Sequence, residues 1–422
     1  MPTERAVVVC VELDRRYAPG GAIWPLADEA QELHELARSS GCQIVGELTA
    51  RRHRPIAGTL LGAGKLDELA SVVAQAQAQV AVFNCELSPA QQRNIEELLR
   101  VKTIDRTQLI LDIFAQRANS QEGKVQVELA QLRYLLPRLV GKGVLLSRLG
   151  GGIGTRGPGE QQLEVDRRRI RMRISRLDRE LEQLGRRREA TRRRRKETEV
   201  PVAALVGYTN AGKTTLLNRL TGAAARASNQ LFTTLDPLAR RMRLPSGETV
   251  VVTDTVGFLH HLPHHLIEAF QATLEETRDA DLLVHVLDVS HPRAWEHAEA
   301  VEEVLAQLRL RDKPMVTALN KRDLVKEPQG LAAFEHSYAP AAAISAVTGE
   351  GMDRLVALLA EQVSARMDTP IRLRLPPERS DLVAEVYRSG QVLKRQDLEG
   401  AVELVARLPA RLAAALAAYV QH

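Results

Sequence analysis

Residues 207–214 read Gly207-Tyr208-Thr209-Asn210-Ala211-Gly212-Lys213-Thr214, and this stretch decides the fold of the middle of the chain. It matches the pattern G-x-x-x-x-G-K-T. The apolar run 202–206 precedes it, and apolar residues at 216–217 suit the start of a helix. A strand, this loop and a helix in that order are the context that a phosphate-binding loop requires. We therefore expect an α/β domain with a parallel sheet, in which a phosphate binds backbone N–H groups at the positive end of the helix.

The polar side chains of this loop have expected roles. Lys213 is expected to reach the β- and γ-phosphates, Thr214 to ligate Mg²⁺ through its hydroxyl, and Thr215 to lie beside the nucleotide. Asn210 offers a side-chain oxygen near the bridge between these phosphates. It either helps to hold a monovalent cation such as K⁺ or only shapes the loop, and the sequence leaves both roles open.

The tetrapeptide Asn320-Lys321-Arg322-Asp323 indicates which nucleotide is bound. It follows an apolar strand candidate at 315–319. The Asp323 carboxylate can accept both N–H donors on the Watson–Crick edge of guanine, whereas adenine lacks this pair and would leave the carboxylate unpaired. Asn320 either contacts the base or braces the phosphate-binding loop, and the stem of Lys321 covers the base. GTP and GDP are therefore the expected ligands.

Two further segments complete the expected site. Asp254-Thr255-Val256-Gly257 ends the strand candidate 249–253. Asp254 suits a contact to Mg²⁺ through water, and the Gly257 N–H suits the γ-phosphate. Farther along, Ser345-Ala346-Val347 follows the short strand candidate 342–344 and is expected to touch the base.

Hydrolysis is expected to depend on a segment that responds to the γ-phosphate. Phe232-Thr233-Thr234-Leu235-Asp236 is expected to order over the metal with GTP and to relax afterwards, and Thr234 is preferred over Thr233 as the threonine that does so. The residue after Gly257 is Phe258, and a phenyl ring cannot orient the attacking water as a glutamine would. Slow intrinsic hydrolysis, stimulated by docking on a partner, is the consequence. Lys213, Thr234 and Gly257 are the residues assigned to this chemistry.

Composition limits the possible classes of protein. A chain of 422 residues is long enough for two to four domains, and a hydrophobic content of 44% is that of a globular protein. No apolar run reaches the ~18 residues of a membrane span, the N-terminus lacks a signal-peptide pattern, and the three cysteines are spaced unlike zinc ligands. We expect a cytoplasmic monomer with reduced thiols and no stable membrane anchor. A peripheral membrane location for part of it stays open.

Positive charge is concentrated ahead of the phosphate-binding loop. Arginines crowd residues 167–188, and the block 192–196 contains only arginine and lysine. Such clustering is the electrostatic footprint of a polyanion, and nucleic acid is the favoured partner. The alternative is a solvated helix face whose arginines are balanced by nearby glutamates.

Residues 1–105 alternate between strand and helix patterns, with strands expected at 6–11, 43–48 and 80–83 and helices at 27–39, 66–77 and 88–99. Ser88 and the proline after it mark the start of the last helix. This order predicts a small α/β domain with a mostly parallel sheet. Gly62-Ala63-Gly64-Lys65 resembles half of a phosphate-binding loop, but a second nucleotide site there is not favoured, and an RNA contact is the alternative.

Residues 106–198 are predicted to form an antiparallel helical hairpin. Apolar residues of 163–184 keep an almost unbroken heptad seam, and the stripe within 127–136 can pack against it. Residues 150–159 between them contain six glycines, a density that no packed element tolerates. We expect an exposed tip that can enter a narrow RNA-lined cavity. A plain linker between domains is the alternative.

The nucleotide-binding domain is expected at 199–366 and a small α+β domain at 367–422. In the latter, strands are expected at 371–375, 382–387 and 402–406 and a helix at 408–419. The sequence of this last domain says little about its role.

The chain as a whole resembles the HflX GTPases. The resemblance rests on the glycine-rich segment 150–160, which unrelated GTPases lack, and on the motifs at 207–214, 231–236, 254–258 and 320–323. The sequence departs from the family pattern at three positions: Thr214 stands where serine is usual, Thr233 stands where alanine is usual, and Arg322 lies inside the base-reading motif. None of them removes a group that binding needs.

The resemblance implies a function on ribosomes. Members of this family bind the large ribosomal subunit and can split ribosomes; the N-terminal domain with its hairpin docks there, and the GTPase domain is stimulated. It also implies Thr214 and Thr234 as Mg²⁺ ligands. The expected protein hydrolyses GTP to GDP and phosphate and contacts ribosomal RNA of the large subunit. The alternatives are an RNA-binding module gated by nucleotide, in which hydrolysis is incidental, and a GTPase of another RNA-linked pathway.

Overall fold

The computed structural model describes residues 3–14, 17, 24–139, 158–197, 200–223, 232, 238–245, 247–259, 276–325, 329–364, 370–398, 400–408 and 410–421 of the 422-residue chain. For residues 158–163, 187–197, 410–411 and 414 it describes the backbone alone. The described residues form two compact units. The first comprises those up to Arg186 together with Phe232, and the second comprises the remainder.

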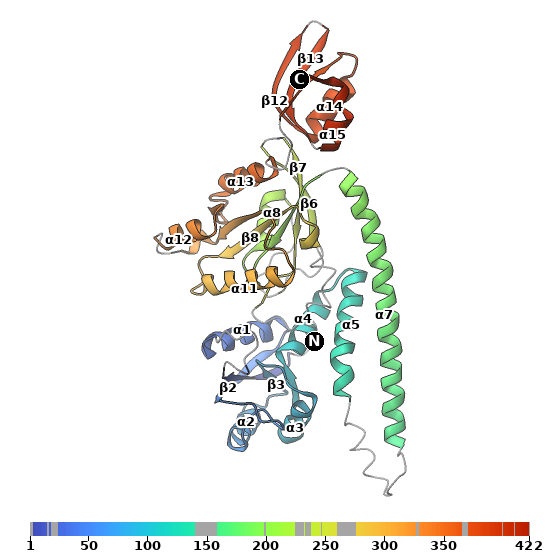
Figure 1. The fold of residues 1–422 in the computed structure, drawn as a ribbon. Coiled ribbons are helices and arrows are strands. Elements are labelled where there is room, and N and C mark those ends of the chain that lie inside the picture. The colour runs from blue at the N-terminus through green and yellow to red at the C-terminus, as the bar shows by residue number, and fades with distance from the viewer. Residues whose placement is uncertain are drawn as a thin grey trace. The chain divides into compact units, whose positions relative to one another are not determined.

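The N-terminal part of the first unit is built on a parallel sheet with the strand order β2-β1-β3-β4. Its elements are β1 (Arg5–Leu13), α1 (Leu26–Ser39), β2 (Gln43–Arg52), α2 (Ala63–Gln75), β3 (Val80–Phe83), α3 (Pro89–Leu99), β4 (Lys102–Asp105) and α4 (Arg106–Arg117). Residues from Ala6 to Val11 of β1 are buried, as expected of a parallel strand with helices on both faces. Helices α1 and α4 cover one face, and α2 and α3 cover the other (Figure 1). The predicted α/β fold is confirmed here.

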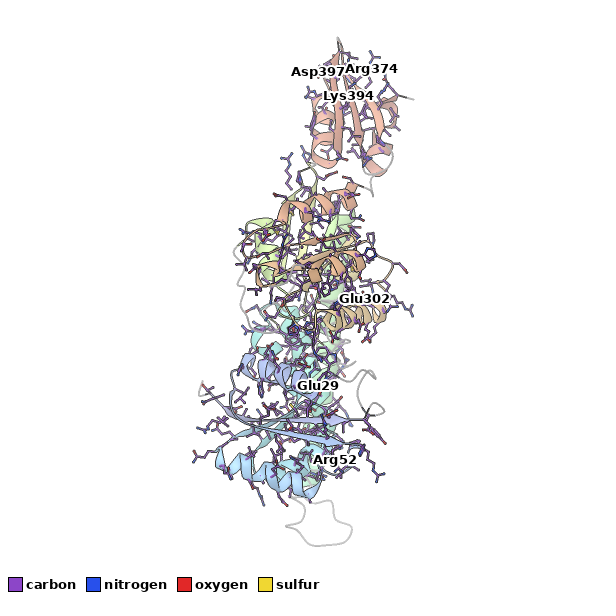
Figure 2. All side chains as sticks on the ribbon, turned by 90° about the vertical axis from the view of Figure 1, so that its left-hand side faces the viewer. Glu29, Arg52, Glu302, Arg374, Lys394 and Asp397 are labelled. Carbon is purple, nitrogen blue, oxygen red and sulfur yellow. The ribbon has the colours of Figure 1, made fainter. Side chains whose placement is uncertain are left out.

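Local sequence sets where the helices of this part begin. At α3, the Ser88 hydroxyl accepts a hydrogen bond from Gln91 N at 3.2 Å, and Gln91 Oε1 accepts one from Ser88 N at 2.9 Å. This reciprocal cap satisfies two N–H groups that the helix itself cannot, and Pro89 occupies the first helical position, where no N–H is needed. Figure 2 adds the described side chains, among them Arg52 at the end of β2.

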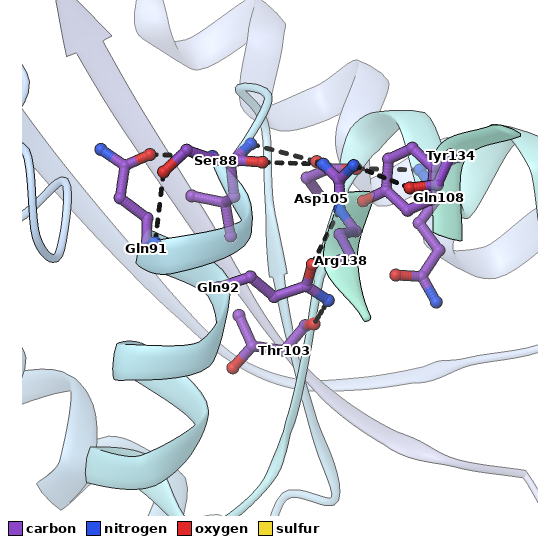
Figure 3. Close-up of polar contacts among 9 residues, drawn as sticks. Ser88, Gln91, Gln92, Thr103, Asp105, Gln108, Tyr134 and Arg138 are labelled. Carbon is purple, nitrogen blue, oxygen red and sulfur yellow. Dashed lines mark hydrogen bonds and ion pairs between the residues drawn. The ribbon is translucent and has the colours of Figure 1, made fainter. Parts of the chain in front are cut away.

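Asp105 ties the end of β4 to helices α4 and α5 (Gln121–Arg138). Its buried carboxylate accepts hydrogen bonds from Leu87 N at 3.0 Å and from Gln108 N at 2.9 Å. The Arg138 guanidinium donates to Asp105 Oδ2 at 3.3 Å and to Leu87 O at 2.7 Å, and it lies over the ring of Tyr134 (Figure 3). The last turn of α5 is thereby fixed to the sheet.

Helix α5 and the 40-residue helix α7 (Pro158–Glu197) form the predicted antiparallel hairpin (Figure 1). Their contact is built around the fully buried Leu177, with Val125, Leu129, Leu132, Ile174 and Leu181. One prediction was wrong: Leu135, which the sequence pattern placed in the seam, is exposed. Helices α4 and α5 are separate, because the chain is extended at Ala118. Of the glycine-rich segment expected at 150–159, residues 150–157 lie outside the described residues, and Pro158 and Gly159 begin α7.

The nucleotide-binding domain has a six-stranded sheet with the order β10-β9-β8-β5-β7-β6, parallel except for β6. Its strands are β5 (Val202–Val206), β6 (Leu238–Arg243), β7 (Thr249–Asp254), β8 (Leu282–Asp288), β9 (Met315–Asn320) and β10 (Ala341–Ala343). Helices α8 (Lys213–Thr221) and α13 (Met352–Ser364) pack on one face, and α11 (Ala294–Gln307) and α12 (Gln329–Ser337) pack on the other. The predicted parallel sheet is confirmed.

The C-terminal domain combines an antiparallel sheet with two helices. Its elements are β11 (Ile371–Leu375), α14 (Ser380–Ser389), β12 (Gln391–Leu398), β13 (Ala401–Arg407), α15 (Ala410–Ala415), the 3-10 turn η2 (Ala417–Tyr419) and β14 (Val420–Gln421). The strand predicted at 382–387 is wrong, because these residues belong to α14. Leu382, Val383 and Val386 recur at helical spacing and face the sheet. The apolar residues Leu382, Ala384 and Val386 are also two apart, which is why the segment resembled a strand.

None of the helices in the described part of the chain is both long and apolar enough to cross a membrane. The longest of them, α7, is rich in arginine.

Candidate nucleotide-binding site

The loop between β5 and α8 folds tightly around the Lys213 side chain. Gly212 precedes α8 with a φ of 95°, a left-handed conformation that favours glycine, and a Cβ there would overlap Asn320 Nδ2. Lys213 is only 7% exposed, and its Nζ donates to Gly207 O at 3.0 Å and to Tyr208 O at 2.8 Å. The amine is therefore held at the centre of the loop that carries the backbone N–H groups.

Burial lowers the pKa of Lys213 to about 8, although the nearby Asp254 carboxylate acts in the opposite direction. A cation in this position lacks the solvation that water would give it. An anionic group that enters the loop restores favourable electrostatics, and a phosphate is the anion to which such a loop is suited.

Thr214 and Asp254 place two oxygen groups beside the amine. The Thr214 hydroxyl donates to Asp254 Oδ2 at 2.6 Å, and both residues are buried, at the start of α8 and the end of β7. Hard oxygen ligands of this kind are those that Mg²⁺ prefers. The residues present fit a magnesium ion, with Thr214 as ligand and Asp254 as the acceptor for a metal-bound water. The other expected ligand, Thr234, lies outside the described residues, as do Thr233, Leu235 and Asp236.

The segment after β7 pairs with the phosphate-binding loop. Thr209 N donates to Phe258 O at 2.8 Å and Phe258 N donates to Gly207 O at 3.1 Å, while the Thr255 hydroxyl donates to Leu205 O at 2.6 Å. A Cβ on Gly257 would lie 2.9 Å from Thr209 Cα, so the absence of a side chain at Gly257 lets the two loops approach each other.

Phe258 is packed into the protein rather than into the site. Its side chain is 1% exposed, and Val256 of the same segment is also buried. The position that a water-orienting glutamine takes in other GTPases thus holds a core side chain.

Asn320 connects three loops. Its Nδ2 donates to Ala211 O at 2.8 Å, and its Oδ1 accepts from Ala346 N at 3.0 Å. The side chain is 2% exposed. Of the two roles expected for Asn320, the geometry gives it the bracing of the phosphate-binding loop.

The rest of the expected base-reading segment is more open. Lys321 has a φ of 64°, and its Nζ pairs with Asp288 Oδ2 at 2.7 Å. Arg322 pairs with Glu350 at 3.3 Å, and Asp323 is exposed. The predicted Asp323 carboxylate is therefore accessible to a ligand.

The last loop is tied to this segment through backbone contacts. Ser345 is buried and its hydroxyl accepts from Thr348 N at 3.1 Å. Ala346 is buried beside Asn320, while Val347 is exposed and its carbonyl accepts from Arg219 at 3.0 Å. The phosphate-binding loop, the Asn320 segment and the Ser345 segment are thus brought together. The predicted Thr215 lies in the first turn of α8.

Two features of the site were not predicted from the sequence. The Tyr208 ring stacks on His297 of α11 with centroids 3.9 Å apart, and the His291 ring stacks on His297 with centroids 4.3 Å apart. Asp288, the partner of Lys321, was also missed, although its position as the last residue of the buried strand β8 was a usable signal. The histidine stack had no such signal, because its members are far apart in sequence and their types fit any helix surface.

Phe232, expected near the nucleotide, packs in the first unit. Its ring is buried against Phe114 of α4, with centroids 4.5 Å apart and planes at 66°. Its side chain is therefore a packing group.

The arginines of α7 are partly neutralised. Among the described side chains, Arg173 forms a two-point contact with Glu128 of α5 at 2.7 Å, and Arg186 pairs with Glu182. Arg168 and Arg176 have no ion pair within the described part of the chain. The balanced helix face that the sequence offered as an alternative is therefore present along part of the helix, and the polyanion surface stays a prediction for the rest.

Profiles of known protein families match the chain along most of its length. The family described as "GTP-binding GTPase N-terminal" matches residues 27–115, and "GTP-binding GTPase Middle Region" matches 117–195. "50S ribosome-binding GTPase" matches 202–321 and "HflX C-terminal domain" matches 334–420.

Individual relatives are similar over nearly the whole chain. A GTPase HflX of Lacrimispora saccharolytica is 44% identical over 414 residues, which cover 98% of this chain and 96% of that protein. The GTPase HflX of Escherichia coli is 44% identical over 384 residues and 90% of both chains. The crystal structure of the SsGBP and GDP complex, 22% identical, has a TM-score of 0.50 over 86% of this chain and 99% of that chain, which shows a shared fold. The chain belongs to the HflX family of GTPases.

Proposed function

We propose that this chain binds GTP, hydrolyses it to GDP and phosphate with Mg²⁺, and acts in the cytoplasm on the large ribosomal subunit, where it dissociates or rescues ribosomes. The observation that supports the nucleotide part is the buried cluster of Lys213 Nζ, Thr214 Oγ1 and Asp254 at the phosphate-binding loop. When bound, Mg²⁺ neutralises charge on the β- and γ-phosphate oxygens. Lys213 donates to the same phosphates, and the backbone N–H groups of 209–214 orient them.

The choice of guanine rests on Asp323, whose exposed carboxylate follows the buried brace Asn320. It accepts two N–H donors of the base, and Lys321, held by Asp288, covers the base from one side. Asn210 has a φ of 60° and is exposed in the phosphate-binding loop, so its side chain is free to supply an oxygen to K⁺ at the phosphates.

Hydrolysis needs a partner because Phe258 is buried and offers no group to the attacking water. A docked partner supplies or orders that group, and the segment around Thr234 is the place where the γ-phosphate is sensed. The large ribosomal subunit is the proposed partner, supported by family membership and by the description "50S ribosome-binding GTPase" of residues 202–321. The basic helix α7 and the tip it leads to are the proposed RNA contacts.

The direct experiment is GTP hydrolysis by the full chain with and without large ribosomal subunits. Stimulation of at least tenfold is expected, and Lys213→Ala is expected to abolish hydrolysis in both conditions. An unstimulated rate would contradict the ribosomal part of the proposal. If Lys213→Ala bound and left subunits as the unchanged protein does, hydrolysis would be incidental and the chain would act as an RNA-binding module.

A further inference from the structure

The C-terminal domain leaves one face of its sheet uncovered. Its elements follow the order β-α-β-β-α-β, and all three strand pairs are antiparallel in the sheet β12-β13-β11-β14. Both helices pack on the same face, where Val386 of α14 and Leu412 of α15 lie against the core of Leu373, Leu375 and Leu404. Because side chains alternate along a strand, the residues between these buried leucines lie on the opposite face.

Strand register identifies the side chains of this open face. Residues paired directly across antiparallel strands share a face, so Arg372, Val405 and Lys394 form one row across three strands. The next row is Arg374, Glu403 and Gln396, and Arg407 pairs with Gln391 at the other end. Arg372, Arg374 and Lys394 are exposed, and Figure 2 labels Arg374 and Lys394 on this domain.

The charge of the open face is strongly biased. Four cations, Arg372, Arg374, Lys394 and Arg407, share it with a single carboxylate, Glu403. Within the described part of the C-terminal domain, none of the four takes part in an ion pair. By contrast, the exposed arginines outside this face each have one: Arg379 with Asp381 at 2.9 Å, Arg388 with Glu385 at 2.6 Å and Arg395 with Asp397 at 2.9 Å. The uncompensated cations are therefore gathered on the one face that no helix covers.

We propose that this open face binds the sugar–phosphate backbone of RNA. Guanidinium groups match phosphate oxygens two at a time, and residues two apart on a strand are separated by roughly 6.6 Å, so Arg372 and Arg374 can reach separate phosphates. None of the described face residues is aromatic, so bases have no ring to stack on. Binding is thus tolerant of sequence and strongly dependent on salt. This goes beyond the proposed function, which places RNA contacts on the helical hairpin.

The test uses two variants of the full chain that lose the same charge from the same domain. The face variant is Arg372→Gln with Arg374→Gln and Lys394→Gln; the control is Arg379→Gln with Arg388→Gln and Arg395→Gln. Binding of a mixed-sequence single-stranded RNA is followed by fluorescence anisotropy over a range of salt. Each phosphate contact contributes ~0.7 to the steepness with which log K falls against log salt. The face variant loses three contacts, so this slope is expected to become less steep by about 2, and binding at low salt is expected to weaken at least tenfold. The control is expected to change affinity less than threefold. Equal weakening by both variants, or none by the face variant, would overturn the proposal.

A crosslinking experiment distinguishes RNA from an acidic protein as the ligand of the open face. A photoreactive phenylalanine analogue replaces Gln396 on the open face in one variant and the adjacent Arg395, on the other face, in a second. With large ribosomal subunits, position 396 is expected to crosslink to RNA and position 395 is not. Crosslinks from 396 to ribosomal protein alone would reject RNA as the ligand. GTP hydrolysis by the free variants is measured alongside, so that loss of the nucleotide site is distinguished from loss of this surface.

Discussion

At the scale of single residues, the nucleotide site depends on buried polar groups that hold loops rather than on groups that face solvent. Asn320 is the clearest case, since both ends of its amide are used, on Ala211 O and Ala346 N. Removing it leaves a buried acceptor and a buried donor without partners, and each unpaired group costs roughly 1–3 kcal/mol.

Asn320→Ala is therefore expected to lower the free energy of unfolding by about 2–4 kcal/mol and to weaken GDP binding. Urea denaturation and titration calorimetry measure the two effects. The matched control is Arg322→Ala, which breaks only an exposed ion pair with Glu350 and is expected to cost less than about 1 kcal/mol. If the two variants were equally stable, Asn320 would not act as a brace.

Asp323 carries the choice of base, and its substitution tests that role directly. Asp323→Asn replaces one acceptor oxygen with a donor, so guanine loses a hydrogen bond while xanthine, with a carbonyl at that edge, gains one. We expect affinity to shift from GTP toward xanthosine triphosphate by at least tenfold. A competition assay with labelled GDP measures the shift, and an unchanged GTP preference would refute the assignment.

Two buried histidines make the stability of the nucleotide domain dependent on pH. Burial, with the nearby Lys213, lowers the pKa of His285 to about 4, and burial, with His291, lowers that of His297 to about 3. Both lie below the ordinary value of 6.5, so only the unfolded chain takes up these protons as the pH falls from 6.5. Stability is full above pH 6.5 and is lost below it, by about 2 kcal/mol per histidine at pH 5.

His285→Leu isolates one of these contributions. Neither ring nitrogen of His285 has a hydrogen-bond partner among the described residues, so an apolar side chain is tolerated. The loss of stability between pH 7.5 and pH 5 is expected to shrink by about 2 kcal/mol, measured by urea unfolding at the two pH values. His336→Leu, at an exposed position of α12, is expected to leave the loss unchanged. An identical pH dependence in both variants would contradict the role of His285.

At the scale of elements, the hairpin of α5 and α7 depends on a small apolar contact. Leu177 is fully buried in it. Leu177→Ala is expected to cost about 2–5 kcal/mol locally and to increase hydrogen exchange along 164–186. Met172→Ala, on the same helix and 57% exposed, is the control that should leave exchange unchanged. Equal exchange in both variants would show that the packing seen at Leu177 does not hold the helices together.

Some of the helices and strands could be predicted from the sequence, and others could not. The positions of the strand ends that carry a glycine, Asp254 or Asn320 could be predicted from the sequence. A buried parallel strand with a polar residue at its carboxyl end leaves few alternative structures for such a segment. Helix α14 was mistaken for a strand because Leu382, Ala384 and Val386 are spaced two apart, while Leu382, Val383 and Val386 share one face of a helix. Strand β12 was missed because Lys394 and the exposed polar residues after it show no apolar alternation. Its place is set by pairing with β13, which only the folded chain reveals.

In the nucleotide site, too, contacts between distant segments could not be predicted from the sequence. The motif residues are local in sequence and could be predicted, whereas the stack of Tyr208, His297 and His291 arises from the approach of α11 to the loop. The burial of the Phe258 side chain likewise depends on tertiary packing. The sequence shows only that glutamine is absent at this position.

At the scale of the whole molecule, a net charge of +5 is unevenly distributed. Unpaired cations lie on α7, ahead of the nucleotide domain in the chain, and on the open sheet of the C-terminal domain after it. Both are proposed to meet RNA, so binding of the full chain to large subunits is expected to weaken steeply with salt.

The central claim is that the loop around Lys213 holds a triphosphate while Asp323 selects guanine. Titration calorimetry with GTP and with ATP, at physiological magnesium and with the full chain, tests it most directly. We expect GTP to bind at least a hundredfold more tightly than ATP, because adenine leaves the carboxylate unpaired. Equal affinity for the two nucleotides would contradict the claim.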